Sequence, residues 1–323
     1  MIYYIIHRFL YAFPLLMGVN ILTFVLFFVV NSPDDMARMQ LGQKHITQQA
    51  INIWKQQHGY DLPLIWNEKA DNPIAETIFY QKSVHLFVFD FGISDSGRNI
   101  GADIKQRMWP SLAVALPSLV IGLFVNISLA LMIVLFRNTY LEHLGIMLCV
   151  MLMSISGLFY IIGGQFLLSK ILLLVPISGF DSGVNGIKFL ILPVLIAVIS
   201  GIGSGVRWYR TLFLEEVEKD YVRTARAKGL SETQVLFKHI LKNAMLPILT
   251  GIVVILPLLF MGSLLTESFF SIPGLGSYTI DAINRQDFAI VRSMVFLGSV
   301  LYIIGLLLTD ISYTLVDPRV RLS

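Results

Sequence analysis

The sequence predicts an all-α integral membrane protein with six transmembrane helices and a large segment outside the membrane between the first two. Two observations support this prediction. Hydrophobic residues make up 55% of the 323 residues and charged residues only 14%, against roughly 25% charged residues in ordinary soluble domains. The charges are also unevenly spaced, so that six stretches of 17 to 29 residues contain none. This composition excludes a soluble enzyme and a disordered protein.

Each of the six uncharged stretches is long enough to cross a membrane once. A helix needs about 20 apolar residues to span roughly 30 Å of hydrocarbon, and lipid offers backbone amides no partner outside the helix. No convincing cleavage site follows the first stretch, so we expect a retained helix rather than a signal peptide. The charges that flank the stretches are, in order, Arg8 and Asp34, Arg107 and Arg137, Glu142 and Lys170, Lys188 and Arg207, Lys242 and Glu267, and Arg292 and Asp310.

Lysine and arginine in short loops predict the orientation of the helices, because such loops stay in the cytoplasm. Basic side chains are dense between Arg207 and Met245, and the tail carries Arg319 and Arg321. Six crossings then place both termini in the cytoplasm. The chain divides into an N-terminal segment with the first helix (1–31), an extracytoplasmic segment (32–110) and the remaining helices (111–323), which include the cytoplasmic loop 207–245.

The extracytoplasmic segment is expected to be folded. Thr47 can cap a short helix that runs through Ile51 and Trp54, and Gly59 can end it. The later run of residues 87–94 is too aromatic for a solvated tether. We expect a folded cap on the helix ends, and the same segment can also be a contact surface for something outside the membrane.

The cytoplasmic loop is expected to contain two helices that meet at a glycine. Residues 220–228 favour a helix with basic side chains in its last turn, facing the negative end of the helix dipole. Gly229 is placed to end this helix in a left-handed conformation, and Ser231 begins a capping box for the next one. Ala225 and Ala227 leave the first helix shallow, so that a groove on a moving partner can hold it. The alternative is a basic amphipathic helix resting on anionic lipid.

The segment after the fifth stretch is expected to form a tight turn at the outer surface. Pro273 and Gly274 suit a type II turn in which the glycine takes a positive φ. Glu267 lies at the end of the stretch, where a carboxylate meets water. We expect this turn to shape an outer gate, and a plain loop is the alternative. The residues assigned to the gate are Glu267, Phe270, Pro273, Gly274 and Gly276.

The sequence contains no motif for catalysis or cofactor binding. It has no phosphate-binding loop, so we expect no ATP to bind to this chain in that mode. Six scattered histidines and the lone Cys149 give no metal-ligand spacing, and no nucleophile is paired with a base. The net charge of +3 is too small to indicate a nucleic-acid partner. Gly201 and Gly205 are spaced for close helix packing, and Asp310 is expected near the inner interface or facing another helix.

The cytoplasmic loop resembles that of ABC-importer permeases. Residues 220–231 read DYVRTARAKGLS and residues 238–247 read KHILKNAMLP. Both strings are similar to the dipeptide/oligopeptide/nickel permease family, of the DppB/OppB type. Further similar strings, in family order, are GYDLPL (59–64), DFGIS (90–94), PISG (176–179), ESFFSIPGLG (267–276) and DPR (317–319). Together they cover nearly the whole chain.

This resemblance implies a type I ABC-importer permease that forms half of a pathway for di- or oligopeptides in a bacterial inner membrane. The implied partners are a related sister permease, two cytoplasmic ATPase subunits that bind ATP and Mg²⁺, an extracytoplasmic solute-binding protein, and membrane lipid. The chain itself is then a non-catalytic transport subunit. The implied ATPase-coupling residues are Arg223, Ala225, Ala227, Gly229, Leu230 and Ser231.

The sequence departs from the family pattern in two places. Arg223 stands where the wider importer motif has a glutamate, so the charge partner of the loop differs. Residues 154–157 lack the proline that relatives commonly carry there, which puts a kink along the pathway in question.

Two alternatives to a peptide permease stay open. Within the same family, the solute can be a nickel chelate or another small molecule. From another class, a self-sufficient secondary transporter or channel predicts internal repeats and charged or interrupted spans, and neither is visible in the sequence.

Overall fold

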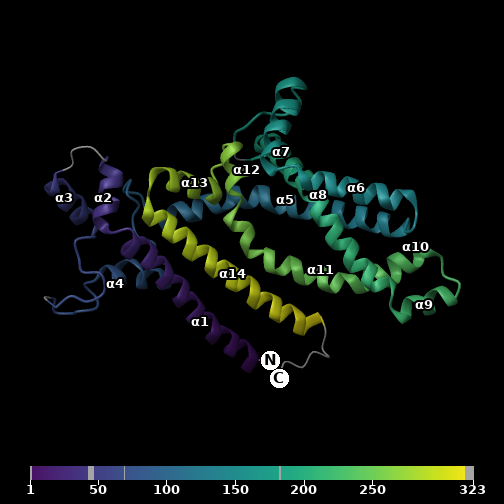
Figure 1. The fold of residues 1–323 in the computed structure, drawn as a ribbon, viewed down its shortest axis with the longest axis horizontal. Helices are drawn as coiled ribbons and strands as arrows, with labels where there is room; N and C mark the ends of the chain where they lie inside the picture. Colours follow the sequence, from purple (N-terminus) through teal and green to yellow (C-terminus); the bar gives the residue numbers. More distant parts are fainter. Residues whose placement is uncertain (1, 43–46, 69, 182, 317–323) are drawn as a thin grey trace. The chain divides into compact units, whose positions relative to one another are not determined.

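Helices make up most of the computed structural model, which describes residues 2–42, 47–68, 70–181 and 183–316 (Figure 1). Within these ranges there is no β-strand, and one isolated bridge joins Ile93 and Asn99. The chain forms two compact units, one from residues 1–108 and 278–307 and the other from residues 109–277 and 308–321. The all-α fold class predicted from the sequence is confirmed.

The first unit contains the first apolar helix and the segment that follows it. Helix α1 (Ile2–Phe24) continues into a π-helical turn (Val25–Val30). Helix α2 (Pro33–Leu41) begins at a capping box, in which the Ser32 hydroxyl accepts a hydrogen bond from the Asp35 N–H at 3.2 Å. The remaining helices of the segment are α3 (Gln48–His58), α4 (Ile78–Lys82) and a 3-10 helix (Val84–Val88).

Thr47 and Gly59 bound α3 as the sequence predicts. The Thr47 hydroxyl accepts a backbone N–H from the first turn, and Gly59 ends the helix with a φ of +66°. Aromatic and aliphatic side chains from α1, α2, α3 and α4 form one core, made of Phe24, Phe27, Phe28, Met36, Ala37, Ile51, Trp54, Tyr60 and Ile78. The segment after the first helix is therefore folded against it, as a cap would be.

The second unit contains the apolar helices between residues 109 and 277, whereas most of the last long helix belongs to the first unit. Helix α5 (Ile100–Leu135) begins in the first unit and continues in the second, where α6 (Tyr140–Ser154), α7 (Gly157–Gly164) and a π-helical turn (Gln165–Ile171) follow. A 3-10 turn (Val184–Gly186) leads into α8 (Ile187–Val217). The chain then forms α9 (Asp220–Ala227), α10 (Glu232–Val235), a π-helical turn (Leu236–Ile240), α11 (Leu241–Ile255), a 3-10 turn (Pro257–Met261), α12 (Leu264–Phe269), α13 (Leu275–Arg285) and α14 (Phe288–Val316).

Five helical spans in the described residues are long and apolar enough to cross a membrane. They are Leu10–Val30, Ile100–Leu135, Val184–Val217, Glu232–Phe269 and Phe288–Ser312. The third uncharged stretch is divided into Tyr140–Ser154 and Gly157–Ile171, which meet at an angle of 87°. The count reaches six when this bent pair is taken as one crossing.

The break in the third stretch occurs without a proline. Ile155 and Ser156 lie between the two helices with extended backbone angles, ψ of 127° and 142°, so the ladder of helical hydrogen bonds stops there. These residues lie where the family resemblance led us to expect a proline that the sequence lacks. The chain is therefore sharply bent at residues 155 and 156 although it has no proline there.

Helix α5 starts before the boundary that hydropathy placed at residue 110. The Asn99 side chain accepts the Ala102 N–H at 2.9 Å and so caps the helix ahead of Ile100. Pro110 lies inside the helix. Hydropathy marks where a helix can enter lipid, whereas the cap fixes where the helix begins, and so the two boundaries differ.

Close packing of α8 depends on glycine, although not on the pair that the sequence indicated. A Cβ on Gly203 would lie 2.6 Å from the Cys149 carbonyl oxygen, and one on Gly205 would lie 2.4 Å from the Asn126 Nδ2. A Cβ on Gly201 would meet nothing within 4 Å. The prediction of a close contact is confirmed at Gly205 and is wrong at Gly201.

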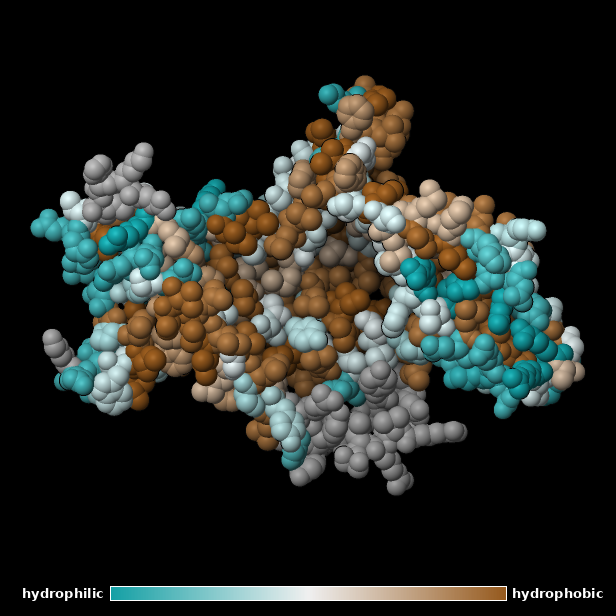
Figure 2. Space-filling view, in the orientation of Figure 1, coloured by the Kyte–Doolittle hydropathy of each residue, from teal (hydrophilic) through white to brown (hydrophobic). Residues whose placement is uncertain are grey.

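Large apolar side chains are widely exposed on the helices, as expected of surfaces that face lipid. Phe124, Tyr140 and Phe159 expose 74%, 94% and 73% of their surface. Figure 2 shows hydrophobic residues over much of the visible face and a concentration of hydrophilic residues over α9 and α10. The two short helices between α8 and α11 thus carry a polar surface that the neighbouring spans lack.

Candidate coupling loop and outer turn

The loop between α8 and α11 folds into two short helices joined at a glycine, as predicted. Gly229 takes a φ of +79°, and its N–H donates to the Arg226 carbonyl oxygen at 2.9 Å. Ser231 and Gln234 then complete the capping box: the Ser231 hydroxyl accepts from the Gln234 N–H, and the Gln234 side chain accepts from the Ser231 N–H. Residues 220–235 are called the coupling elbow below.

The inner face of the coupling elbow packs into the core of the second unit. Val222 and Val235 are fully buried there and Ala225 is 4% exposed, among side chains of α8 and α11 that include Phe213 and Ala244. Ala225 was assigned to a surface for a partner, but its side chain faces this core. It therefore supports the elbow from inside, and Leu230 also packs partly against the same core.

A partly buried hydrogen bond adds to this support. The Tyr221 hydroxyl donates to the Glu216 carboxylate near the end of α8. Burial, followed by this bond to the carboxylate, raises the pKa of Tyr221 to about 12. The phenol therefore stays protonated at neutral pH and keeps α9 attached to α8.

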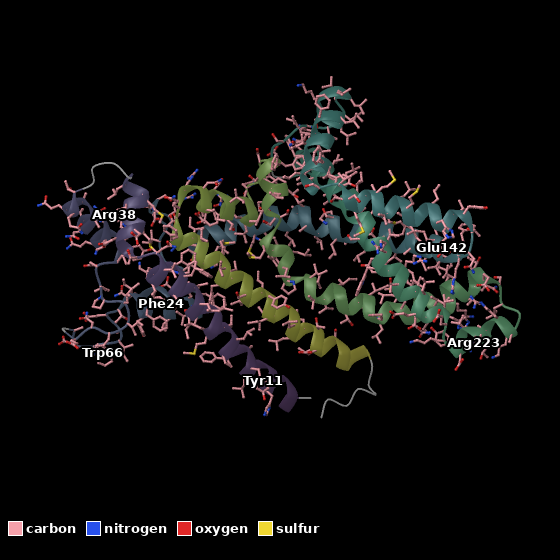
Figure 3. The ribbon with its side chains drawn as sticks, viewed as in Figure 1. Tyr11, Phe24, Arg38, Trp66, Glu142 and Arg223 are labelled. Atoms are coloured by element: carbon pink, nitrogen blue, oxygen red, sulfur yellow. The ribbon has the colours of Figure 1, made fainter. Side chains whose placement is uncertain are left out.

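The outer face of the elbow is exposed, basic and shallow. Arg223 is paired with Asp220 at 3.5 Å across one helical turn (Figure 3), and the Arg226 guanidinium donates to both carboxylate oxygens of Glu232 at 2.8 and 3.0 Å. Ala227, Gly229 and Ser231 are exposed beside them. A Cβ on Gly229 would meet nothing within 4 Å. Of the six predicted coupling residues, a partner can therefore reach Arg223, Ala227, Gly229 and Ser231.

A buried ion pair fixes the loop between α5 and α6 to α8. The Glu142 carboxylate on α6 is paired with Arg210 on α8, and it also accepts the Asn138 N–H at 2.7 Å (Figure 3). Glu142 is 6% exposed. In the sequence Glu142 marks only the edge of an uncharged stretch, because nothing there indicates that Arg210 lies beside it.

The turn after α12 encloses a carboxylate. Glu267 is 1% exposed, and its Oε2 accepts the Ser277 N–H at 3.0 Å. The Ser111 hydroxyl of α5 accepts the Leu275 N–H at 2.8 Å beside it. The expectation that Glu267 meets water is therefore wrong, because the chain folds back over the carboxylate through α13. Ser111, Gly262, Glu267, Gly274 and Gly276 are called the Glu267 cluster below.

The three glycines of the Glu267 cluster leave room for the carboxylate. A Cβ on Gly262, Gly274 or Gly276 would lie 1.8, 2.3 or 2.9 Å from a Glu267 carboxylate oxygen. Side-chain atoms essentially never approach so closely, so each position excludes any larger residue as long as the glutamate stays in place. The cluster joins α12 and the start of α13 to α5.

The predicted type II turn at Pro273 and Gly274 is not formed. The residue with a positive φ is Ser271, at +55°, and Gly274 has none. Ser271 takes this conformation as α12 ends, and the Ile272 N–H donates back to the Glu267 carbonyl oxygen at 2.9 Å. Gly274 is therefore needed for the space it leaves and not for its backbone freedom.

The predicted gate residues come together, with one exception. Phe270 is 1% exposed, and its carbonyl oxygen accepts the Gly179 N–H at 2.8 Å, which ties the turn to the segment after α7. Gln165 also donates to the Phe269 carbonyl oxygen at 3.1 Å. Pro273 is exposed. The turn is therefore a packed junction of three parts of the second unit rather than a plain loop.

Groups that could hold a metal ion are absent from the part of the chain that the structure describes, where no three His, Cys, Asp or Glu side chains cluster suitably. Asp310 lies within α14 and is partly buried. Residues 317–319, which carry part of the family resemblance, lie outside the described residues.

Comparison with known proteins gives the family. Residues 127–322 match the family described as the inner membrane component of binding-protein-dependent transport systems, and residues 1–70 match the N-terminal part of such components. The glutathione transport system permease protein GsiC of Salmonella typhimurium is 30% identical over 322 residues, covering 99% of both chains. The dipeptide transport system permease protein DppB of Bacillus subtilis is 29% identical over 322 residues, covering 99% of this chain and 98% of its own.

Proposed function

The chain belongs to the inner membrane components of binding-protein-dependent transport systems, and on this basis we propose that it is the permease subunit of an ATP-driven importer of short peptides. The peptide class is supported by two relatives, one named for glutathione and the other for dipeptides, that align with the chain from end to end. Glutathione is itself a tripeptide, so both named solutes are small and carry peptide bonds and carboxylates.

The coupling elbow is the observation that supports an ATP-driven mechanism. It consists of two exposed short helices at the ends of two membrane helices. Buried contacts and the Tyr221 hydrogen bond hold it against them. A partner that binds it can move α8 and α11 together, because the buried side chains of the elbow pack in one core with side chains of both helices. We propose that one of two ATPase subunits docks here, on the cytoplasmic side, while a sister permease completes the pathway and a binding protein delivers the solute.

In this proposal the chain performs no chemistry. ATP and Mg²⁺ bind to the ATPase subunits, and nucleotide binding closes them and moves the elbow between two positions, as in other rigid-element switches. The Glu267 cluster, at the opposite end of the α11–α12 span from the elbow, is proposed to act as a firm junction of the outer gate. Both termini are then cytoplasmic.

Reconstitution in liposomes tests the proposal. The permease pair, the ATPases and the binding protein are purified together, and uptake of radiolabelled alanyl-alanine is measured with ATP hydrolysis. We expect uptake that requires ATP and the binding protein. Uptake of a nickel chelate in place of the dipeptide would move the chain to the alternative substrate within the family. Uptake by the permease alone, driven by an ion gradient, would contradict the ATP-driven mechanism.

Cysteine labelling tests the orientation separately. A cysteine at Asn72 should react with an impermeant thiol reagent in intact cells, and one at Ser231 only after permeabilisation. Cys149 is buried and should give little background. Labelling at Ser231 in intact cells would show that the elbow faces outward, where an ATPase cannot dock.

A further inference from the structure

The first unit contains a polar pocket that the transport function does not require. Its volume is about 690 Å³, within the range of small-molecule sites. It lies between the end of α3, the end of α4, the residues before α5 and the first turn of α14. The lining includes three glutamines, Gln56, Gln57 and Gln81, together with Lys82, Asp90 and Arg292.

Arg292 is a buried cation without a partner. It is 4% exposed, and its Nε is buried with no hydrogen bond in the described part of the chain. Its guanidinium lies over the Phe28 ring, 5.3 Å from the centroid. An aromatic face offsets only part of the cost of burying a charge, and among the described residues no carboxylate forms an ion pair with this guanidinium.

Lys82 is a second cation of the same pocket. Its Nζ lies 5.3 Å from the centroid of the Tyr60 ring, and Tyr60 packs on Phe28 at 5.5 Å between centroids. None of the ion pairs among the described residues includes Lys82 or Arg292. Burial, and then the charge of Arg292, lower the pKa of Lys82. Each cation thus lies near one ring of the same aromatic pair, and the two cations repel each other.

Asp95 lines the same pocket and attracts both cations, but neither it nor Asp90 forms an ion pair with them. Asp95 faces His58 at 3.5 Å and accepts from Gln40, and its own N–H donates to Asp287 at 3.0 Å. Asp90 lies at the rim, where its side chain is 61% exposed and accepts the Gly92 N–H at 3.1 Å. The pocket therefore holds two cations that form no ion pair with its carboxylates, and its rim carries the Asp90 carboxylate.

We propose that this pocket binds a short peptide, with the peptide carboxylate between Lys82 and Arg292. The glutamine side chains around it both donate and accept, which suits peptide bonds, and Asp90 at the rim has the sign that suits a free amino group. The identity of the ligand as a peptide rests on the proposed function, whereas the anionic group rests on the two cations that form no ion pair and on the buried Arg292 Nε without a hydrogen bond.

Direct binding to the detergent-solubilised permease pair, without the binding protein, tests this inference. The probe is alanyl-alanine, compared with alanyl-alanine amide, which lacks the carboxylate. We expect the amide to bind at least roughly tenfold more weakly, because it loses a charge-assisted interaction. Lys82→Gln should weaken binding of the dipeptide to a similar extent and leave the amide unaffected. Lys55→Gln is the matched control, since Lys55 lies in α3 outside the pocket and is paired with Asp34 at 2.7 Å.

Arg292→Lys provides a second variant that keeps the buried charge, and a melting curve shows whether it folds. Equal binding of dipeptide and amide, or full binding by Lys82→Gln, would overturn the inference. Inorganic phosphate that competes as well as the dipeptide would overturn the peptide assignment. Absence of dipeptide binding, together with weaker capture of the binding protein by Lys82→Gln, would assign the pocket to a protein contact instead. Peptide uptake in liposomes is measured in parallel, so that a failed pocket and a failed transport function give different results.

Discussion

The coupling elbow and the Glu267 cluster both depend on glycine, but for opposite physical reasons. Gly229 has a left-handed backbone and open space around it, so that only its φ of +79° selects glycine. Gly274 has an ordinary backbone and no space, because Glu267 Oε2 lies 2.3 Å from where its Cβ would be. A side chain at Gly229 therefore strains the chain slightly and projects outward, whereas a side chain at Gly274 must displace a buried carboxylate.

This difference separates what each region can do. The Glu267 cluster is complete within one chain, and its glycines serve internal packing. The elbow leaves open space beside Gly229 on an exposed basic surface. A groove on a partner could hold such a shallow surface. Substitutions at the two glycines should therefore fail in different assays, and this contrast can be tested.

The largest effect is expected at Gly274. Gly274→Val should destabilise the permease and abolish uptake, since overpacking of a filled site costs about 1–3 kcal/mol even for smaller additions. Gly251→Ala in α11 is the control, because a Cβ there meets nothing within 4 Å. Melting temperature in detergent and uptake in liposomes measure both effects.

A double variant tests the cause. Gly274→Ala should lose stability when Glu267 is present and lose less in a Glu267→Ala background, where the carboxylate is gone and the Ser111 hydroxyl, 2.5 Å from the Cβ position, still crowds the methyl group. Equal losses in the two backgrounds would show that Glu267 is not the group that excludes a side chain. In that case the cluster would not explain why glycine is required.

The second effect is expected at Gly229. Gly229→Val should leave membrane insertion and pairing with the sister permease intact, since the local strain is only about 1–2 kcal/mol. Peptide-stimulated ATP hydrolysis by the reconstituted complex should fall roughly tenfold, if a packed partner adds a cost of similar size to the strain. Gly229→Ala, which adds one methyl group, should be milder.

Gly42→Val is the matched control for Gly229→Val. Gly42 also has a positive φ, +93°, and nothing within 4 Å of its Cβ position, but it lies in the segment after the first helix. A side chain there also strains the backbone, but Gly42 has no proposed ATPase contact. Normal stimulated hydrolysis in Gly229→Val would remove the coupling role and favour the interpretation that the elbow rests on lipid.

The contrast also explains which parts the sequence could predict. The elbow is built from local signals, a glycine after a basic helix and a Ser231–Gln234 box, and these were predicted correctly. Its inward side was not: Ala225 was placed on the partner surface because a lone helix does not show which face will be buried. Tertiary packing with α8 and α11 decides that.

The Glu267 cluster depends on contacts that are distant in sequence. Ser111 is 164 residues from Leu275, whose N–H it binds, and nothing local indicates that α13 will close over the carboxylate. Pro273-Gly274 is a common turn pair, so the sequence favoured a positive φ at the wrong residue. The 87° bend in the third stretch was missed for a related reason, since no proline or glycine pair marks residues 155 and 156.

A smaller effect is expected at Tyr221, inside the elbow. Tyr221→Phe removes the hydroxyl that donates to Glu216 and should lower the stability of the permease by about 1 kcal/mol. Tyr140→Phe, on a side chain that is 94% exposed, is the control and should have no effect. If the hydrogen bond holds the elbow in place, Tyr221→Phe should also reduce stimulated hydrolysis slightly. A change in stability with full coupling would show that the elbow keeps its position without this bond.

The smallest effect is expected at the surface pair of the elbow. Arg226 and Glu232 form a bidentate ion pair, but their side chains are 40% and 61% exposed, and exposed pairs contribute less than about 1 kcal/mol. Arg226→Gln should therefore shift the melting temperature less than Tyr221→Phe does. The remaining difference should vanish in high salt, because salt screens exposed charges. A loss as large as that of Tyr221→Phe would mean that the surface pair, rather than the buried contacts of Val222 and Ala225, fixes the angle between α9 and α10. A small loss leaves the Arg226 guanidinium free to exchange Glu232 for a carboxylate on a partner, which an elbow that docks and releases requires.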